Sequence, residues 1–321
     1  MAVPNNLLKR IFFGAVLTVF FGFFLVFEGW LSCRGYFAGA SLARPLAGLG
    51  VGLLVLILAV TGCVELAGLA GAKDRGVFLP ATVAPVVLLL SQPFVHEALG
   101  GGAAGGGAAW GGALGGGALA GGLTEPMVVL LGCLFLAGII HVLRFGTRGA
   151  IGQLGFHSLA LLYMGLGCWL VLAIRLLGRP SQTAMGQAGY LLLFLGCVKS
   201  CDIGAYIIGS VWGRHRLVPS VSPKKTWEGF LGGIVVGTVV AVVVAWASGI
   251  ISVREALVFG PVVAISGQLG DLFESVLKRD AGSKDSAALI PEFGGVLDLL
   301  DSIIGAAPFG YMILAGAAGS S

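Results

Sequence analysis

Residues 229–250 read GFLGGIVVGTVVAVVVAWASGI, a run of 22 residues without a charged side chain. An α-helix rises about 1.5 Å per residue, so this run is long enough to cross the roughly 30 Å hydrocarbon core of a bilayer. The whole chain shares this character: it is 57% hydrophobic and 11% charged, with a mean hydropathy of +0.99. No water-soluble domain of this length has so apolar a surface, so the sequence predicts an all-α, polytopic integral membrane protein.

Similar apolar runs recur along the chain and predict about nine transmembrane helices. We expect the first run to be retained rather than removed as a signal peptide, because it is long and ends without a small-residue cleavage site. The chain then divides into N-terminal helices (1–98), a glycine- and alanine-rich linker (99–126), middle helices (127–187) and a C-terminal catalytic domain (188–321). The nine predicted spans are 11–32, 46–70, 77–95, 127–143, 151–177, 188–211, 229–250, 254–276 and 296–318.

Most lysines and arginines fall in alternate connections between these spans. The positive-inside rule therefore places the N-terminus and the charged C-terminal loops in the cytoplasm. On that side we expect Lys9, Arg10, Lys73, Arg75, Arg144, Arg148, Arg214, Arg216, Lys224, Lys225, Lys278, Arg279 and Lys284, and on the other Arg34, Arg44, Arg175, Arg179 and Arg254.

Glycine and alanine make up nearly all of residues 100–122. This composition favours a flexible external linker. A closely packed helix of small residues is an alternative that would raise the span count to ten. A phosphate-binding loop is less favoured, because the stretch has no lysine or other charged residue.

Ionisable side chains within the predicted spans indicate where chemistry takes place, because they are costly in hydrocarbon. Glu65 stands alone in the second span and is most simply explained as an interhelical packing contact. The others come in pairs: Lys199 and Asp202 in the sixth span, Asp271 and Glu274 in the eighth, and Asp298 and Asp301 in the ninth. We expect Lys199 and Asp202 to support a substrate site.

The end of the eighth span gathers polar residues on one helix face. Asp271, Glu274, Ser275 and Lys278 occupy positions i, i+3, i+4 and i+7, which stack above one another at 3.6 residues per turn. This face predicts a substrate contact for Ser275 and metal binding for the two carboxylates.

Asp298 and Asp301 repeat the i, i+3 spacing at the start of the ninth span. Four carboxylates that face each other repel unless they are protonated or bridged by a cation. Mg²⁺ prefers oxygen ligands and is often held by carboxylates together with substrate phosphates. We therefore predict a Mg²⁺ site formed by Asp271, Glu274, Asp298 and Asp301.

Two charged loops flank these helices on the predicted cytoplasmic side. The loop at 278–285 carries Lys278, Arg279, Lys284 and Asp285, which suit a triphosphate leaving as pyrophosphate. The loop at 222–229 reads SPKKTWEG, in which Pro223 predicts a turn and Thr226 a helix start. An ordinary surface loop and contact with anionic lipid headgroups are the simpler alternatives. Anion binding is predicted for Ser222, Lys224, Lys225 and Thr226.

These motifs together resemble the signature of the phosphatidate cytidylyltransferases, or CDP-diacylglycerol synthases. The matching residues are Ser275-x-x-Lys278-Arg279, Lys284-Asp285, Ile290-Pro291, Gly294-Gly295, Asp298 and Asp301-Ser302, together with Asp202-x-x-Ala205-Tyr206 and the SPKKTWEG run. The resemblance is strong over residues 199–310 and mainly hydropathic before them.

The resemblance implies transfer of cytidylyl from CTP to phosphatidate, with release of pyrophosphate, for phospholipid synthesis. It also implies Mg²⁺ with a second, monovalent cation such as K⁺, contact with membrane lipids and a homodimer. Nucleic acid is not an expected partner. We expect the protein in the cell's inner (plasma) membrane with its active site facing the cytoplasm.

The chain departs from the family pattern at two positions, where Phe293 and Leu299 replace a histidine and an arginine. An inactive divergent paralogue is therefore one alternative, and a CTP-dependent lipid kinase is another. An ion-coupled transporter is disfavoured, because such proteins place carboxylates near the midplane of two matching halves, and the N-terminal half here has no counterpart. We expect an active enzyme, because charge positioning dominates phosphoryl-type transfer.

Overall fold

A computed structural model gives the architecture of residues 49–71, 79–98, 118–147, 149–177, 188–283 and 295–320. For residues 93, 95–98, 118–125 and 319–320 it describes the backbone alone. The first predicted span, at 11–32, lies outside these residues, as do Lys284, Asp285, Phe293 and most of the glycine-rich stretch.

The described chain is almost entirely helical, which confirms the predicted all-α class. Within the described ranges, seven helices are long and apolar enough to cross a membrane, and α4 holds a shorter apolar segment at Leu79–Gln92. Segments α6, η1 and α7 follow one another without a break and together form one of the seven. The elements are α3 (Leu49–Gly71), α4 (Leu79–Ala98), α5 (Ala118–Phe145), α6 (Ala150–Ala160), the π-helix η1 (Leu161–Leu166), α7 (Gly167–Leu176), α8 (Ala188–Trp212), β1 (Arg216–Val218), β2 (Ser222–Thr226), α9 (Trp227–Ser248), α10 (Val253–Asp280) and α11 (Val296–Ser320).

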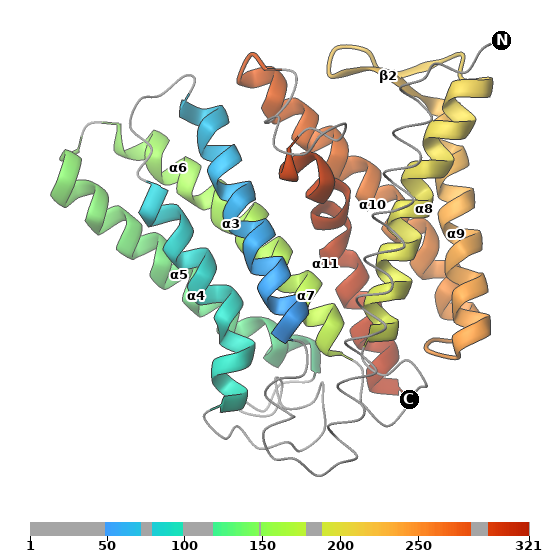
Figure 1. Ribbon diagram of the computed structural model, residues 1–321, viewed down its shortest axis with the longest axis horizontal. Coiled ribbons are helices and arrows are strands. Elements are labelled where there is room, and N and C mark those ends of the chain that lie inside the picture. Colours follow the sequence, from blue (N-terminus) through green and yellow to red (C-terminus); the bar gives the residue numbers. More distant parts are fainter. Residues whose placement is uncertain are drawn as a thin grey trace.

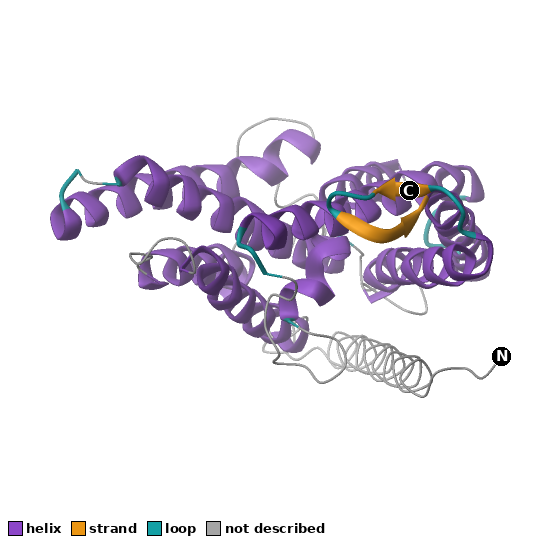
Figure 2. Cartoon of the chain, turned by 90° about the horizontal axis from the view of Figure 1, so that it is seen from above, coloured by secondary structure: helices purple, strands orange, loops and turns teal. Residues whose placement is uncertain are grey.

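The helices alternate in direction, so that α3, α5, α8 and α10 end on the side where α4, α6, α9 and α11 begin (Figure 1). The β1–β2 hairpin lies over one end of the α8–α11 group (Figure 2). It occupies the same end of the molecule as the last turn of α10 and the first turn of α11 (Figure 1). The charged loops predicted from the sequence therefore share one end of the bundle.

Two local expectations are wrong. The strand β2 includes Pro223, and the turn of the hairpin precedes it, since Val221 donates its backbone N–H to the carbonyl of Val218 at 3.2 Å. Proline has no N–H to give to a strand pair, and an edge strand tolerates this. Helix α5 also begins at Ala118, within the range assigned to the linker, because a helix can extend beyond the apolar window that marks a membrane span.

Helices α10 and α11 cross with their backbones in contact at Gly270 and Gly305. A Cβ added to Gly305 would lie 2.5 Å from the Cα of Gly270, and a Cβ added to Gly270 would lie 2.4 Å from the carbonyl oxygen of Asp301. Such close approach is typical of small residues in membrane helices. Because Asp271 and Asp301 lie next to this crossing along their helices, it brings the two carboxylate-bearing segments together.

Candidate active site

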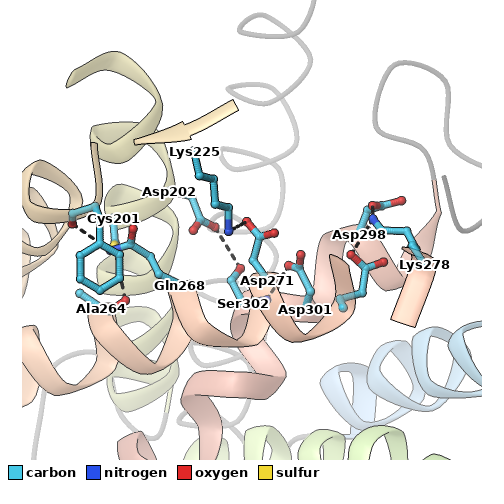
Figure 3. A network of polar contacts seen from close by, with 12 residues as sticks. Cys201, Asp202, Lys225, Ala264, Gln268, Asp271, Lys278, Asp298, Asp301 and Ser302 are labelled. Carbon is cyan, nitrogen blue, oxygen red and sulfur yellow. Dashed lines mark hydrogen bonds and ion pairs between the residues drawn. The ribbon is translucent and has the colours of Figure 1, made fainter. Parts of the chain in front are cut away.

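A row of charged and polar side chains lies between α8, β2, α10 and α11. Asp202 is at one end of the row and Lys278 with Asp298 at the other, with Asp271 and Asp301 side by side between them (Figure 3). The polar residues come from three helices, α8, α10 and α11, that are otherwise mainly apolar, and from the strand β2. The structure thus brings together residues separated by about 100 positions in the sequence.

At the Asp202 end of the row, Lys199 is held by three acceptors. Its Nζ donates to Oδ2 of Asp202 at 3.3 Å, to Oγ of Ser302 at 3.1 Å and to the backbone carbonyl of Leu299 at 3.2 Å. Ser302 in turn donates to Oδ2 of Asp202 at 3.0 Å. This network joins α8 to α11 through Lys199, Asp202 and Ser302.

The hairpin contributes a lysine to the middle of the row. Nζ of Lys225 lies 2.8 Å from Oδ2 of Asp271, and both side chains are partly exposed. The neighbouring Lys224 is exposed, because successive residues of a strand point to opposite sides. The two adjacent lysines therefore have different surroundings, which the sequence does not distinguish.

Lys278 bridges two carboxylates at the other end of the row. Its Nζ lies 2.6 Å from Oε2 of Glu274, one helical turn earlier, and also forms an ion pair with Asp298 at the start of α11. Oδ2 of Asp298 accepts the backbone N–H of Gly295 at 2.9 Å. The Glu274 side chain is 1% exposed. Because a buried charge requires a partner, Lys278 stabilises this carboxylate and ties α10 to α11.

Lysines pair with three of the four predicted metal-binding carboxylates. Asp271 is paired with Lys225, Glu274 and Asp298 with Lys278, and Asp301 accepts the N–H of Ser302. Among the described residues, no three histidine, cysteine or acidic side chains come close enough to form a metal site by themselves. Any metal bound here would need further ligands from substrate or water.

The hairpin is fixed to the helices by specific contacts. Thr226 is buried, and its hydroxyl accepts the backbone N–H of Gly229 at 3.2 Å as the N-cap of α9, which confirms the predicted helix start. Oε1 of Glu228 lies 2.6 Å from Nδ1 of His215. Arg279 donates from Nε to the carbonyl of Val221 at 3.2 Å. These contacts hold Lys224 and Lys225 over the ends of α10 and α11.

The remaining predicted site residues lie nearby. Ser275 is half-buried on the helix face that carries Glu274 and Lys278, and Ser222 is half-buried at the start of β2. Gly282, with a φ of 70°, follows the end of α10 and allows the chain to turn in the left-handed region that glycine adopts easily. Lys284 and Asp285 come directly after the described part of this turn and lie outside the described residues.

The sequence does not show the partners of two further residues. Ser302 belongs to the Asp301-Ser302 motif, and the structure shows that it connects Lys199 with Asp202. Glu65 makes the interhelical contact expected of it, since its carboxylate accepts two backbone N–H groups at the start of α11. The signal for Glu65 was present, since it is a lone ionisable residue in an apolar span, but its partner is not visible from sequence.

Comparison with known proteins matches residues 35–316 to the cytidylyltransferase family. The chain is 38% identical over 166 residues to a phosphatidate cytidylyltransferase of Bacillus subtilis, covering 51% of this chain and 59% of that protein. It is 43% identical over 172 residues to a phosphatidate cytidylyltransferase of Haemophilus influenzae, covering 52% of this chain and 58% of that protein.

A third relative is the uncharacterized protein YnbB of Escherichia coli, which is 40% identical over 139 residues, 43% of this chain and 47% of that protein. The chain thus matches less than two thirds of the length of each of these relatives. The family match nevertheless spans nearly all of the helices described above, and it agrees with the resemblance carried by the C-terminal motifs. The chain belongs to the cytidylyltransferase family.

Proposed function

We propose that the protein is a CTP:phosphatidate cytidylyltransferase, a nucleotidyltransferase that makes CDP-diacylglycerol. An oxygen of the phosphatidate phosphate attacks the α-phosphorus of CTP, and a new P–O bond forms. The bond from the α-phosphorus to the bridging oxygen of the β-phosphate breaks, and pyrophosphate leaves with its electron pair. The observation that carries the proposal is the row of paired lysines and carboxylates between α8, β2, α10 and α11, in a member of this family.

The two lysines of the hairpin, Lys224 and Lys225, and the neighbouring Arg279 suit the phosphates of both substrates. Lys224 is exposed, and Lys225 forms an ion pair with Asp271. Arg279 is exposed beside the hairpin. We assign CTP and phosphatidate phosphate contacts to these three cations together with Ser222, Ser275 and Lys284, and a catalytic role to Asp285. The attacking phosphatidate oxygen needs no strong base to activate it, since it is already ionised near neutral pH.

The donor set fits a hard cation such as Mg²⁺. All four carboxylates offer oxygen, and Oε1 of Glu274 is buried with no hydrogen-bond partner among the described residues. Mg²⁺ is commonly held by one or two carboxylates and completed by water and phosphate oxygens, which suits a site without three protein ligands in place. Asp271, Glu274, Asp298 and Asp301 would hold it, and when bound it would neutralise charge on the phosphates. A monovalent cation such as K⁺ is a second proposed component.

The distribution of basic residues favours a cytoplasmic active site in the cell's inner membrane. The end of the bundle that carries the hairpin holds Arg144, Arg214, Arg216, Lys224, Lys225, Lys278 and Arg279, whereas Arg175 and Arg254 belong to the opposite end. The positive-inside rule assigns the more basic end to the cytoplasm, where CTP is available. Phosphatidate then reaches the site from the inner leaflet. A homodimer is proposed from the family resemblance alone.

The replacement of the family's arginine by Leu299 is compatible with activity. In this position the backbone carbonyl of Leu299 accepts a hydrogen bond from Lys199 at 3.2 Å, and the side chain is not needed for that contact. Phe293, which replaces the family's histidine, lies outside the described residues. The proposed chemistry uses neither missing side chain.

The direct test is to incubate membranes that contain this chain with phosphatidate, magnesium and CTP labelled at the α-phosphorus. Labelled CDP-diacylglycerol together with pyrophosphate is the expected result. Formation of CDP and a new lipid phosphate would instead identify a CTP-dependent kinase. Absence of product, in conditions where a known synthase is active, would refute the proposal.

An Asp298→Asn variant separates chemistry from folding in the same assay. It keeps the size of the side chain and one acceptor oxygen, but removes the charge that faces Lys278. We expect normal amounts of protein in the membrane and no detectable product. Asp280→Asn, at the exposed end of α10, is the matched control and should keep full activity.

A further inference from the structure

Lys199 and Asp202, at one end of the row, differ in how much of their hydrogen-bonding capacity the fold uses. The ammonium group of Lys199 has three N–H donors, and the site provides three acceptors for them. Asp202 accepts from Lys199 and from Ser302, and both hydrogen bonds end on Oδ2. Among the described residues no hydrogen bond reaches Oδ1, and the Asp202 side chain is 33% exposed. Lys199 is therefore fully used, whereas Asp202 has an oxygen available to a ligand.

An aromatic ring continues the same face of α8. Lys199, Asp202 and Tyr206 occupy positions i, i+3 and i+7, which stack above one another on a helix. The first two residues of this face make their contacts with α11. Tyr206 lies one turn further towards the hairpin and is 57% exposed. An uncovered ring on the face that carries Asp202 is a surface on which a flat group can stack.

The open oxygen of Asp202 requires a ligand that donates a hydrogen bond, because an ionised carboxylate only accepts. The phosphates of CTP and of phosphatidate do not meet this requirement, since a carboxylate repels an anion. The diacylglycerol part of phosphatidate has ester oxygens but no N–H or O–H group. Within the two substrates, the donors are therefore the amino group of cytosine and the hydroxyl groups of ribose.

The neighbouring ring favours the base over the sugar. Every nucleobase has a π-face that stacks on an aromatic side chain, whereas ribose has none. Carboxylates accept hydrogen bonds from the amino group of cytosine in nucleic-acid recognition, and uracil carries a carbonyl oxygen at that position, which a carboxylate repels. We propose that Asp202 and Tyr206 form a cytosine-binding subsite, in which the base stacks on Tyr206 and donates its amino N–H to Oδ1 of Asp202.

The location of this subsite agrees with the positions of the cations. Lys225 pairs with Asp271, which lies between Asp202 and Lys278 along the row (Figure 3). A nucleotide whose base is held at Asp202 therefore directs its phosphates along the row, towards Lys225 and then Lys278. Lys199 is a positioning residue in this arrangement, because its three hydrogen bonds hold the Asp202 carboxylate against α11.

This inference deepens the proposed function, since it assigns the part of the site that selects the nucleotide. It is tested by nucleotide binding alone, so that its outcome does not depend on catalysis. The full-length chain is purified in detergent, and binding of radiolabelled CTP is measured by equilibrium dialysis with Mg²⁺ and without phosphatidate. Unlabelled UTP and dCTP serve as competitors, because UTP lacks the amino group and dCTP lacks the ribose 2′-hydroxyl.

The unchanged chain should bind CTP about tenfold more tightly than UTP, a difference of about 1.4 kcal/mol. Asp202→Asn should bring the two affinities within about threefold of each other, because an amide can accept from cytosine and can also donate to the carbonyl oxygen of uracil. Glu255→Gln is the matched control. Glu255 lies in the first turn of α10, at the opposite end of the bundle, and its replacement should leave the preference for CTP unchanged.

Tyr206 provides a second test, which remains decisive if Asp202→Asn is poorly folded. Tyr206→Leu should weaken binding of CTP and UTP alike by about fivefold, at the lower end of the range for base–aromatic stacking. Tyr206→Phe retains the ring and should bind CTP as the unchanged chain does. Trp246→Leu is the matched control, because Trp246 is 77% exposed near the opposite end of the bundle.

Four results would overturn the inference. They are equal affinity of the unchanged chain for CTP and UTP, a CTP preference that persists in well-folded Asp202→Asn, a loss of discrimination in that variant against dCTP only, and unaltered CTP binding by Tyr206→Leu. The third would place ribose at Asp202, and the fourth would show that the ring faces lipid. The expected shifts in nucleotide binding would support the inference even if no CDP-diacylglycerol forms in the enzyme assay.

Discussion

The carboxylate of Glu65, near the end of α3, accepts the backbone N–H of Val296 at 2.8 Å, although the two residues are 231 positions apart. Its second oxygen accepts the N–H of Leu297 at 2.9 Å. The first N–H groups of a helix have no partner within it, and a carboxylate also interacts favourably with the positive end of the helix dipole. Glu65 therefore caps α11 from another helix and fixes the segment that carries Asp298 and Asp301.

Replacing Glu65 with alanine should lower both stability and activity. The two buried N–H groups would each lose an acceptor, at a cost of about 1–3 kcal/mol for each group. Thermal unfolding of the detergent-solubilised protein measures the first effect, and CDP-diacylglycerol formation measures the second. Glu255→Ala is the control, because Glu255 forms the capping box of α10 at the other end of the bundle. An unaltered melting temperature in Glu65→Ala would contradict the capping role.

Lys278→Met should be strongly destabilising because it leaves Glu274 buried without its cation. Breaking a buried ion pair by removing one partner costs about 3–5 kcal/mol. The double variant Lys278→Met/Glu274→Gln should regain most of the stability, since the uncompensated charge is gone, but should remain inactive. Comparison of the melting temperatures and of the rates of the two variants tests this. Recovery of activity in the double variant would show that Lys278 acts only in the fold.

The adjacent residues Lys224 and Lys225 should differ in effect. Lys225→Gln removes the partner of Asp271 within the site, and we expect a fall in kcat of at least tenfold, or about 1.4 kcal/mol. Lys224→Gln alters an exposed charge, and should mainly raise the KM for CTP in a manner that added salt reduces. Steady-state kinetics at two ionic strengths separate the two. Equal losses of kcat would mean that the hairpin is oriented differently during the reaction.

Gly305→Ala should separate α10 from α11. The new methyl group would lie 2.5 Å from the Cα of Gly270, so the backbones must move apart, and overpacking of this kind typically costs about 1–3 kcal/mol. We expect a lower melting temperature and a large loss of activity.

Gly316→Ala on the same helix serves as the control, because nothing lies within 4 Å of the added carbon. It should leave activity unchanged. Similar behaviour of the two variants would show that loss of glycine in α11, rather than the crossing with α10, causes the effect.

Much of the site was predictable because helical periodicity places nearby residues on one face. The spacing of Asp271, Glu274 and Lys278 predicts one shared helix face, on which the last two form an ion pair, and Thr226 is the predicted helix start. The partners of these residues were not predictable. The sequence does not show that Lys225 pairs with Asp271 or that Lys278 reaches Asp298, because each of these contacts joins two different elements.

By itself, the sequence determined that this is an all-α membrane protein, that its charge gathers at the C-terminal loops, and that its motifs are those of a cytidylyltransferase. The first two properties follow from composition and from spacing within single helices, and the third from the resemblance of these motifs to those of a known family. Only the tertiary structure decided that Glu65 caps α11, that Gly270 and Gly305 let two helices touch, and that Tyr163 packs against Phe273. Such contacts join segments 35 to 231 residues apart, and their partners depend on how whole helices pack rather than on any local pattern.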